Sequence, residues 1–139
     1  MLAFYRPDTK PKGRVPTEAV EQTMFVQRFH LTWPDTIIFH VPNEGRASIG
    51  WRLKQKRLGL ISGAPDLIVL DPVGEFHGLL IEMKRSNGVA SNLSDNQKLF
   101  LTEASDKGYF SAVCFGADAA MNACVDYFNM GKASVVNLK

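Results

Sequence analysis

The stretch "GAPDLIVLDPVGEFHGLLIEMKRSNG" (residues 63–88) places charged side chains against the most apolar part of the chain. It holds two apolar runs, "LIVL" and "GLLI", separated by the turn-forming sequence "PVGEF". Asp66 precedes the first run, and Glu82 and Lys84 follow the second. Burying a charged group without a partner is costly. These groups therefore lie either at exposed strand ends or around a metal ion.

The two apolar runs predict a hairpin of buried strands. If the strands are antiparallel, the start of the first neighbours the end of the second, so Asp66 lies beside Glu82 and Lys84. Glu82 and Lys84 project from one face because side chains alternate along a strand. Two carboxylates and a backbone carbonyl are hard ligands that suit Mg²⁺ or Mn²⁺. Lys84 could then orient the attacking water, act as its base, or neutralise charge developing on a phosphate.

The alternative interpretation makes Asp66 a turn residue after Pro65 and makes Glu82 and Lys84 a solvated ion pair. An E-x-K sequence is common, and by itself it favours this simpler interpretation. The combination of P-D before one apolar strand and E-x-K at the end of the next strand is much rarer. The combination favours a metal site.

The elements on both sides of the hairpin indicate the fold class. We expect a helix over 17–33 capped by Thr17, a strand over 36–42, a helix over 93–108, a strand over 109–116 and a helix over 117–130. The order helix, strand, strand, strand, helix, strand, helix predicts an α/β fold with a mixed sheet flanked by helices.

Length and composition limit the class of protein. A chain of 139 residues, 45% hydrophobic and 22% charged, is typical of one globular domain with one core. It has no apolar run of about 20 residues, and its start lacks the features of a signal peptide. We therefore expect an intracellular, cytoplasmic protein with no membrane partner. Cys114 and Cys124 are expected to be buried free thiols.

Basic residues are concentrated in one segment, although the net charge is only +2. No acidic residue lies between Glu44 and Asp66, and the segment "EGRASIGWRLKQKRLGLISG" reads as a loop punctuated by glycines. It is either a solvated face or a loop that contacts DNA phosphates, since clustered basic residues neutralise phosphates. The candidate DNA-binding residues are Arg46, Arg52, Lys54, Lys56 and Arg57.

The P-D and E-M-K motifs at 65–66 and 82–84 resemble the signature of PD-(D/E)XK nucleases. Their surroundings, "FHVPNEG", "KRLGLISGAPDLIVL", "HGLLIEMKR", "LSDNQKLFL" and "GYFSAVCFGADAA", resemble the VRR-NUC branch, especially its small stand-alone phage and bacterial members. The resemblance covers about residues 16–128 of a single 1–139 domain, with 1–15 and 130–139 as tails. It implies a restriction-endonuclease-like core and metal-dependent phosphodiester hydrolysis that leaves a 5′-phosphate and a 3′-hydroxyl.

The resemblance also implies roles for individual residues. Asp66 and Glu82 match the metal-binding acids, the backbone carbonyl of Met83 matches a further ligand, and Lys84 matches the catalytic lysine. The family places a glutamate of its first helix near the metal. Glu18 fits the family's E-x-x-x-Q pattern better than Glu21, but their spacing puts both on one helix face.

Gln97 matches a glutamine that lies near the active site in these nucleases. It also stands at the fourth position of the sequence Ser94-Asp95-Asn96-Gln97, which predicts a capping box at the start of a helix. The two roles are compatible. His40 and Asn43 are candidate groups near DNA, but for His40 the interpretation that it packs against or caps the end of a strand is preferred.

The resemblance points to branched DNA, such as a Holliday junction, as the substrate and to a homodimer as the active form. One domain carries one active site, so paired incisions require two protomers. A nickase or a flap- or end-processing nuclease is an alternative. A catalytically silent DNA-binding module and a structural protein with surface acids are hypotheses from other classes.

Overall fold

The computed structural model describes residues 2–42 and 48–137. Its elements are β1 (Leu2–Tyr5), α1 (Glu18–Thr32), β2 (Ile38–His40), α2 (Ile49–Arg57), β3 (Leu67–Val69), β4 (Leu79–Lys84), a short 3-10 helix (Ala90–Asn92), α3 (Asp95–Asp106), β5 (Phe110–Phe115) and α4 (Ala117–Asn137). The predicted α/β fold, with a mixed sheet flanked by helices, is confirmed.

The five strands form one sheet in the order β1-β5-β4-β3-β2. β3 pairs antiparallel with both β2 and β4, as the predicted hairpin requires. β5 pairs parallel with β4 and with β1. β4 therefore lies at the centre of the sheet, which explains why all six of its residues are buried, including Glu82 and Lys84.

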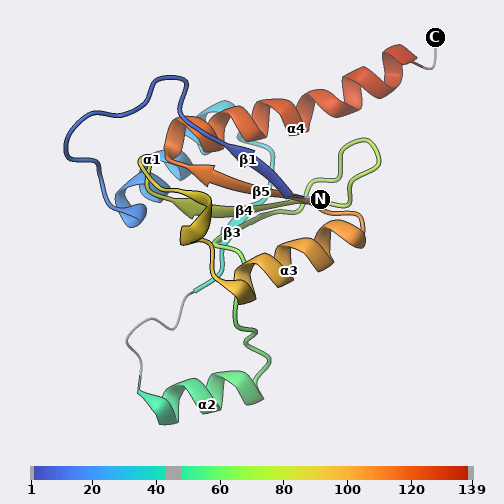
Figure 1. Cartoon of the computed structure of the whole chain (residues 1–139). Coiled ribbons are helices and arrows are strands. Elements are labelled where there is room, and N and C mark those ends of the chain that lie inside the picture. The colour runs from blue at the N-terminus through green and yellow to red at the C-terminus, as the bar shows by residue number, and fades with distance from the viewer. Residues whose placement is uncertain (1, 43–47, 138–139) are drawn as a thin grey trace.

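Helices cover both faces of the sheet (Figure 1). α1 and α4 pack on one face, and Phe25, Phe29 and Tyr127 fill the core between them and the strands. α3 packs on the other face, where Leu101 meets Leu80 and other apolar residues of the sheet. None of the described helices combines the length and apolarity needed to cross a bilayer.

Two of the predicted helix boundaries depend on capping residues that the structure contains. The Thr17 side chain accepts a hydrogen bond from the Val20 backbone N and caps α1, while Ser94 and Gln97 form the predicted capping box of α3. Cys114 and Cys124 are buried free thiols, as expected.

Three segments differ from the sequence-based prediction. Residues 1–15 were expected to be a tail, but Leu2–Tyr5 form β1. The partner of β1 is β5, which lies more than a hundred residues away in the sequence. No local sequence pattern therefore predicts this pairing. Residues 130–139 were also expected to be a tail, but α4 continues to Asn137.

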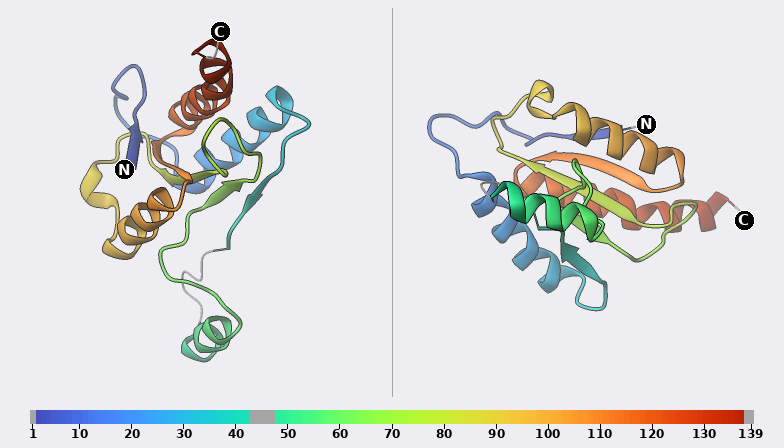
Figure 2. Two further views of the ribbon diagram at one scale, coloured as in Figure 1. Left: turned by 90° about the vertical axis from the view of Figure 1, so that its right-hand side faces the viewer. Right: turned by 90° about the horizontal axis from the view of Figure 1, so that it is seen from below.

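The third difference is the basic segment, which was expected to be a loop but contains the helix α2. Ser48 caps this helix through a hydrogen bond from the Trp51 backbone N, and Gly59 follows its end with a φ of 110°. Serine before and glycine after a run of Arg, Leu, Lys and Gln are ordinary helix boundaries. α2 buries none of its residues and stands apart from the sheet (Figures 1 and 2).

Candidate active site

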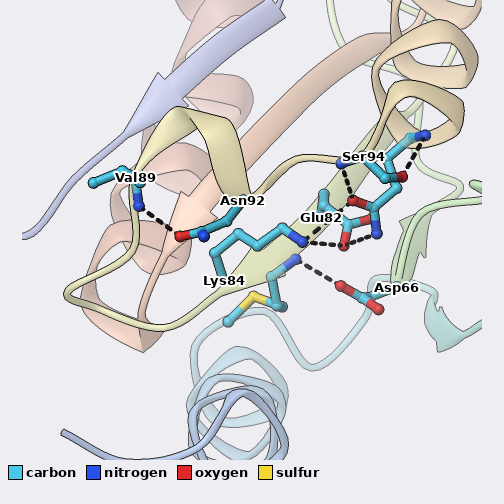
Figure 3. Close-up of polar contacts among 8 residues, drawn as sticks. Asp66, Glu82, Lys84, Val89, Asn92 and Ser94 are labelled. Carbon is cyan, nitrogen blue, oxygen red and sulfur yellow. Dashed lines mark hydrogen bonds and ion pairs between the residues drawn. The ribbon is translucent and has the colours of Figure 1, made fainter. Parts of the chain in front are cut away.

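The β3–β4 pair brings the predicted acidic residues together. Leu67 lies opposite Ile81 in the antiparallel register, so Asp66, just before β3, is adjacent to the end of β4. The Met83 backbone N donates a hydrogen bond of 2.7 Å to Oδ2 of Asp66 (Figure 3). The Asp66 carboxylate is half-buried.

Pro65 determines what the Met83 carbonyl can bind. The N–H and C=O groups of one strand residue point to the same neighbouring strand, so the Met83 carbonyl points toward β3, as its N–H does. Continued by two residues beyond the Leu67–Ile81 pair, the register would set Pro65 opposite Met83. Proline has no N–H to donate. The Met83 carbonyl thus lacks its ordinary ladder partner on the side where Asp66 lies.

Glu82 is buried, with only 2% of its surface exposed. Its Oε2 atom accepts a hydrogen bond of 3.1 Å from Nε2 of Gln97, whereas Oε1 has no hydrogen-bond partner among the described residues. Burial, and then the charge and hydrogen bond of Asp66, raise the pKa of Glu82 to about 9. When Asp66 and Glu82 are both ionised, the Lys84 ammonium group offsets only one of the two negative charges, and a divalent cation would supply the missing positive charge. The residues present therefore fit a hard metal ion.

Lys84 is held in the site by Gln97. Its Nζ atom donates to Oε1 of Gln97 over 3.2 Å and lies 3.9 Å from Oε2 of Glu82. Oε1 of Gln97 also accepts a hydrogen bond of 2.9 Å from the Ser94 backbone N, which is part of the capping box. The Gln97 side chain therefore caps α3 and contacts both Glu82 and Lys84.

The two glutamates of α1 lie in different surroundings. Glu18 is exposed at the first turn, and its charge is among those that raise the pKa of Glu82. Glu21 is buried, and its Oε2 atom lies 2.7 Å from the position that a Cβ on Gly116 would take. The surroundings of Glu18 thus favour it as the glutamate near the site. No group of three His, Cys, Asp or Glu side chains that could hold a metal is found among the described residues.

A polar cavity of about 180 Å³ opens beside Asp66. Its wall includes Ser94, Gln97 and the segment 60–64 that leads from α2 back to the sheet. This segment is fixed to the start of α3, because Asn96 Nδ2 donates to Ser62 Oγ over 3.1 Å. The cavity extends from Asp66 to Leu60, on the segment that follows α2.

The candidate DNA-binding residues divide into two groups. Arg52, Lys54, Lys56 and Arg57 lie on α2 and are exposed, whereas Arg46, like Asn43, falls outside the described residues. Trp51 is also exposed on α2. No acidic side chain of the helix offsets its basic residues, so α2 presents a positively charged surface.

His40 and Gln22 make a contact at Asp66 that the sequence did not predict. Nδ1 of His40 lies 3.0 Å from the Asp66 backbone carbonyl and 3.0 Å from Nε2 of Gln22. Gln22 is the glutamine of the E-x-x-x-Q pattern, which is the only sequence signal that marks it. His40 ends a three-residue edge strand, and its sequence carries no spacing that predicts this contact.

Comparison with known proteins identifies a family for this chain. The family model described as "VRR-NUC domain" matches residues 9–118. A solved structure described as "VRR_NUC domain protein" is 27% identical to this chain, with a TM-score of 0.69. The similarity covers 87% of this chain and 93% of that one. Comparison with the curated proteins finds no match.

Proposed function

Because the chain belongs to the VRR-NUC family of PD-(D/E)XK nucleases, we propose that it is a divalent-metal-dependent DNA endonuclease that acts on branched DNA. The observation that carries the proposal is the buried Glu82, whose Oε1 atom has no partner among the described residues and which lies beside Asp66 and Lys84. This combination is unfavourable in a purely structural protein and suits a cation-dependent hydrolase.

The proposed metal ligands are Asp66, Glu82, the Met83 carbonyl and, from the first turn of α1, Glu18. Mg²⁺ or Mn²⁺ bound there would lower the pKa of a water molecule and neutralise charge on a DNA phosphate. Lys84 orients the attacking water or offsets the developing negative charge. Gln97 keeps the Lys84 ammonium group at its place by accepting its hydrogen bond.

DNA is proposed to lie across the polar cavity and along α2. The basic residues of α2 supply phosphate contacts of the kind that give nucleic-acid binding its affinity. α2 extends away from the sheet, so a duplex arm in contact with α2 could remain connected to a strand in the active site (Figure 1). A DNA contact on α2, away from the point of cleavage, suits a branched substrate.

A homodimer is proposed because paired incisions in a junction need two active sites. An apolar groove of about 410 Å³ lies between α3 and the strands β2 and β3, with Phe39, Leu70 and Tyr109 in its wall. Apolar surface of this kind is often buried in contacts between proteins. A monomeric mass at micromolar concentration, with and without DNA, would remove the dimer from the proposal.

The test is cleavage of a labelled four-way junction beside matched duplex, single-stranded and flap DNA in Mg²⁺, Mn²⁺ or EDTA. The Lys84→Ala protein runs in parallel. Metal-dependent and Lys84-dependent cutting confined to the junction is the expected result. Cutting of flaps or nicking of duplexes would support the nuclease activity but would contradict the proposed preference for junctions. Binding without any cutting would overturn the enzymatic proposal in favour of a silent DNA-binding module.

A further inference from the structure

His40 connects three elements at the back of the candidate metal site. It ends β2, its Nδ1 atom lies 3.0 Å from the Asp66 carbonyl before β3, and the same atom lies 3.0 Å from the Gln22 amide on α1. Gln22 is one helical turn after Glu18, so both side chains share a face of α1. The contact therefore ties the helix that carries Glu18 to the residue Asp66.

The chemistry of the partners locates the proton of the His40 ring. A carbonyl oxygen only accepts hydrogen bonds, so Nδ1 must donate to Asp66. The structure places Nε2 of Gln22 toward Nδ1, so both contacts are hydrogen bonds only when the amide is turned to present its oxygen, an exchange that leaves the side-chain shape unchanged. In that orientation Nδ1–H is shared between the Gln22 oxygen and the Asp66 carbonyl, while Nε2 of His40 takes no part in this contact.

The contact completes the hydrogen bonding of the Asp66 carbonyl. This oxygen also accepts from the Val41 backbone N over 2.9 Å. Two donors occupy its two lone pairs, which holds the peptide group that follows Asp66 in one orientation. At the other end of the residue, the carboxylate accepts from the Met83 N. Asp66 is therefore held at its carbonyl and at its carboxylate by different strands.

We propose that His40 and Gln22 form a positioning pair that sets the spacing between Glu18 and Asp66 for a divalent cation. The inference rests on the proposed metal-dependent function. His40 acts through Nδ1 on the backbone of Asp66 and takes no proton from water or DNA through Nε2. Groups that orient metal ligands in this way commonly change metal affinity by about 10- to 100-fold when they are removed.

The first test measures Mn²⁺ binding without DNA, by calorimetry and by the metal-induced rise in Tm. His40→Ala is expected to raise the Kd for Mn²⁺ by about tenfold or more. His40→Asn keeps a donor near the position of Nδ1 and is expected to restore binding to within about threefold of the wild type. His40→Gln places its amide near the position of Nε2 and should bind as weakly as His40→Ala. His30→Ala, at an exposed position in the last turn of α1, is the matched control.

The second test measures cleavage over a range of Mn²⁺ concentrations. His40→Ala is expected to need more metal and to recover most of the wild-type kcat at saturating metal. A kcat that stays low at saturation, or rescue by His40→Gln and not by His40→Asn, would overturn the positioning role. Gln22→Ala provides the same comparison if His40→Ala does not fold, and unchanged Mn²⁺ affinity in this variant would also overturn the proposal.

The outcomes separate this inference from the function on which it rests. A wild-type protein that binds no Mn²⁺ refutes the metal-dependent function itself. A wild-type protein that binds Mn²⁺, together with a His40→Ala variant of equal affinity, refutes only the positioning pair.

Discussion

Leu67 pairs with Ile81 at the last printed position of the β3–β4 ladder, and continuing this register by two residues would set Pro65 opposite Met83, where the next ladder hydrogen bond would form. Any other residue at position 65 would bring an N–H group to that place. The proline of the P-D motif therefore has a physical role of its own, in addition to the role of the Asp66 carboxylate that follows it. It keeps a donor away from the carbonyl that the proposed cation would need.

Pro65→Ala tests this role. The new N–H group can donate to the Met83 carbonyl and compete with a cation, so the Kd for Mn²⁺ should rise several-fold while the fold is kept. Pro72→Ala, in the turn that joins β3 to β4, is the control for a general effect of losing proline. The role is wrong if both variants bind Mn²⁺ as the wild type does.

Gln97 and Ser94 share a capping box, which allows the two roles of Gln97 to be separated. Gln97→Ala and Ser94→Ala should each lower the free energy of unfolding by about 1 kcal/mol, because each removes a capping hydrogen bond. Only Gln97→Ala also removes the hydrogen bonds of this side chain to Lys84 and Glu82. We expect cleavage at least tenfold slower in Gln97→Ala than in Ser94→Ala. Equal cleavage rates in the two variants would show that Gln97 acts only as a helix cap.

The raised pKa of Glu82 predicts how the stability of the metal-free protein changes with pH. The carboxyl group is protonated in the native state up to a pKa of about 9, whereas 4.5 is its ordinary value. Between these values the native state binds one proton more than the unfolded state, so stability falls as pH rises. The slope from this group is at most about 1.4 kcal/mol per pH unit.

Denaturant unfolding in EDTA at several pH values between 5 and 9 measures this effect. Glu82→Gln removes the titrating group and should flatten the decline relative to the wild type. Parallel curves for the two proteins would mean that Glu82 does not carry a raised pKa.

The basic face of α2 predicts the salt dependence of DNA binding. Replacing Arg52, Lys54 and Lys56 together with glutamine should weaken binding and lower the slope of log K against log salt by roughly 2 to 3. A control variant replaces Lys10, Lys12 and Lys107 with glutamine and removes the same charge from other exposed positions. A slope unchanged in the α2 variant would refute the role of this helix.

Gly63 holds the segment between α2 and the sheet against the start of α3. It has a φ of 87°, and a Cβ atom there would lie 2.3 Å from the Asn96 carbonyl oxygen. Gly59 has a φ of 110° but no neighbour within 4 Å of such an atom. Both alanine variants meet backbone strain of roughly 1 to 3 kcal/mol.

Only Gly63→Ala must also displace the wall of the cavity beside Asp66. We therefore expect Gly63→Ala to reduce cleavage and DNA affinity more than Gly59→Ala does. The comparison uses kcat/KM on the preferred DNA substrate together with the free energy of unfolding. Equal losses in both variants would show that the cavity wall is unimportant.

Much of the site could be predicted from the sequence because its main residues lie on one hairpin. The alternation of side chains and the antiparallel pairing of two apolar runs are local consequences of the residues between Pro65 and Lys84. The capping sequences at Thr17 and Ser94 are equally local. β1 could not be predicted in the same way, since four apolar residues at the start of a chain become a strand only when β5 lies beside them.

The sequence by itself determined the hairpin, the residue types of the candidate metal site and the fold class, because each depends on short-range periodicity and turn chemistry. The tertiary structure decided which groups meet across distant elements. It left Glu18 exposed and buried Glu21, placed Gln97 beside both Glu82 and Lys84, and brought His40 beside both Gln22 and Asp66. These contacts depend on how α1 and α3 pack against the sheet, and that packing follows from the burial of the whole core.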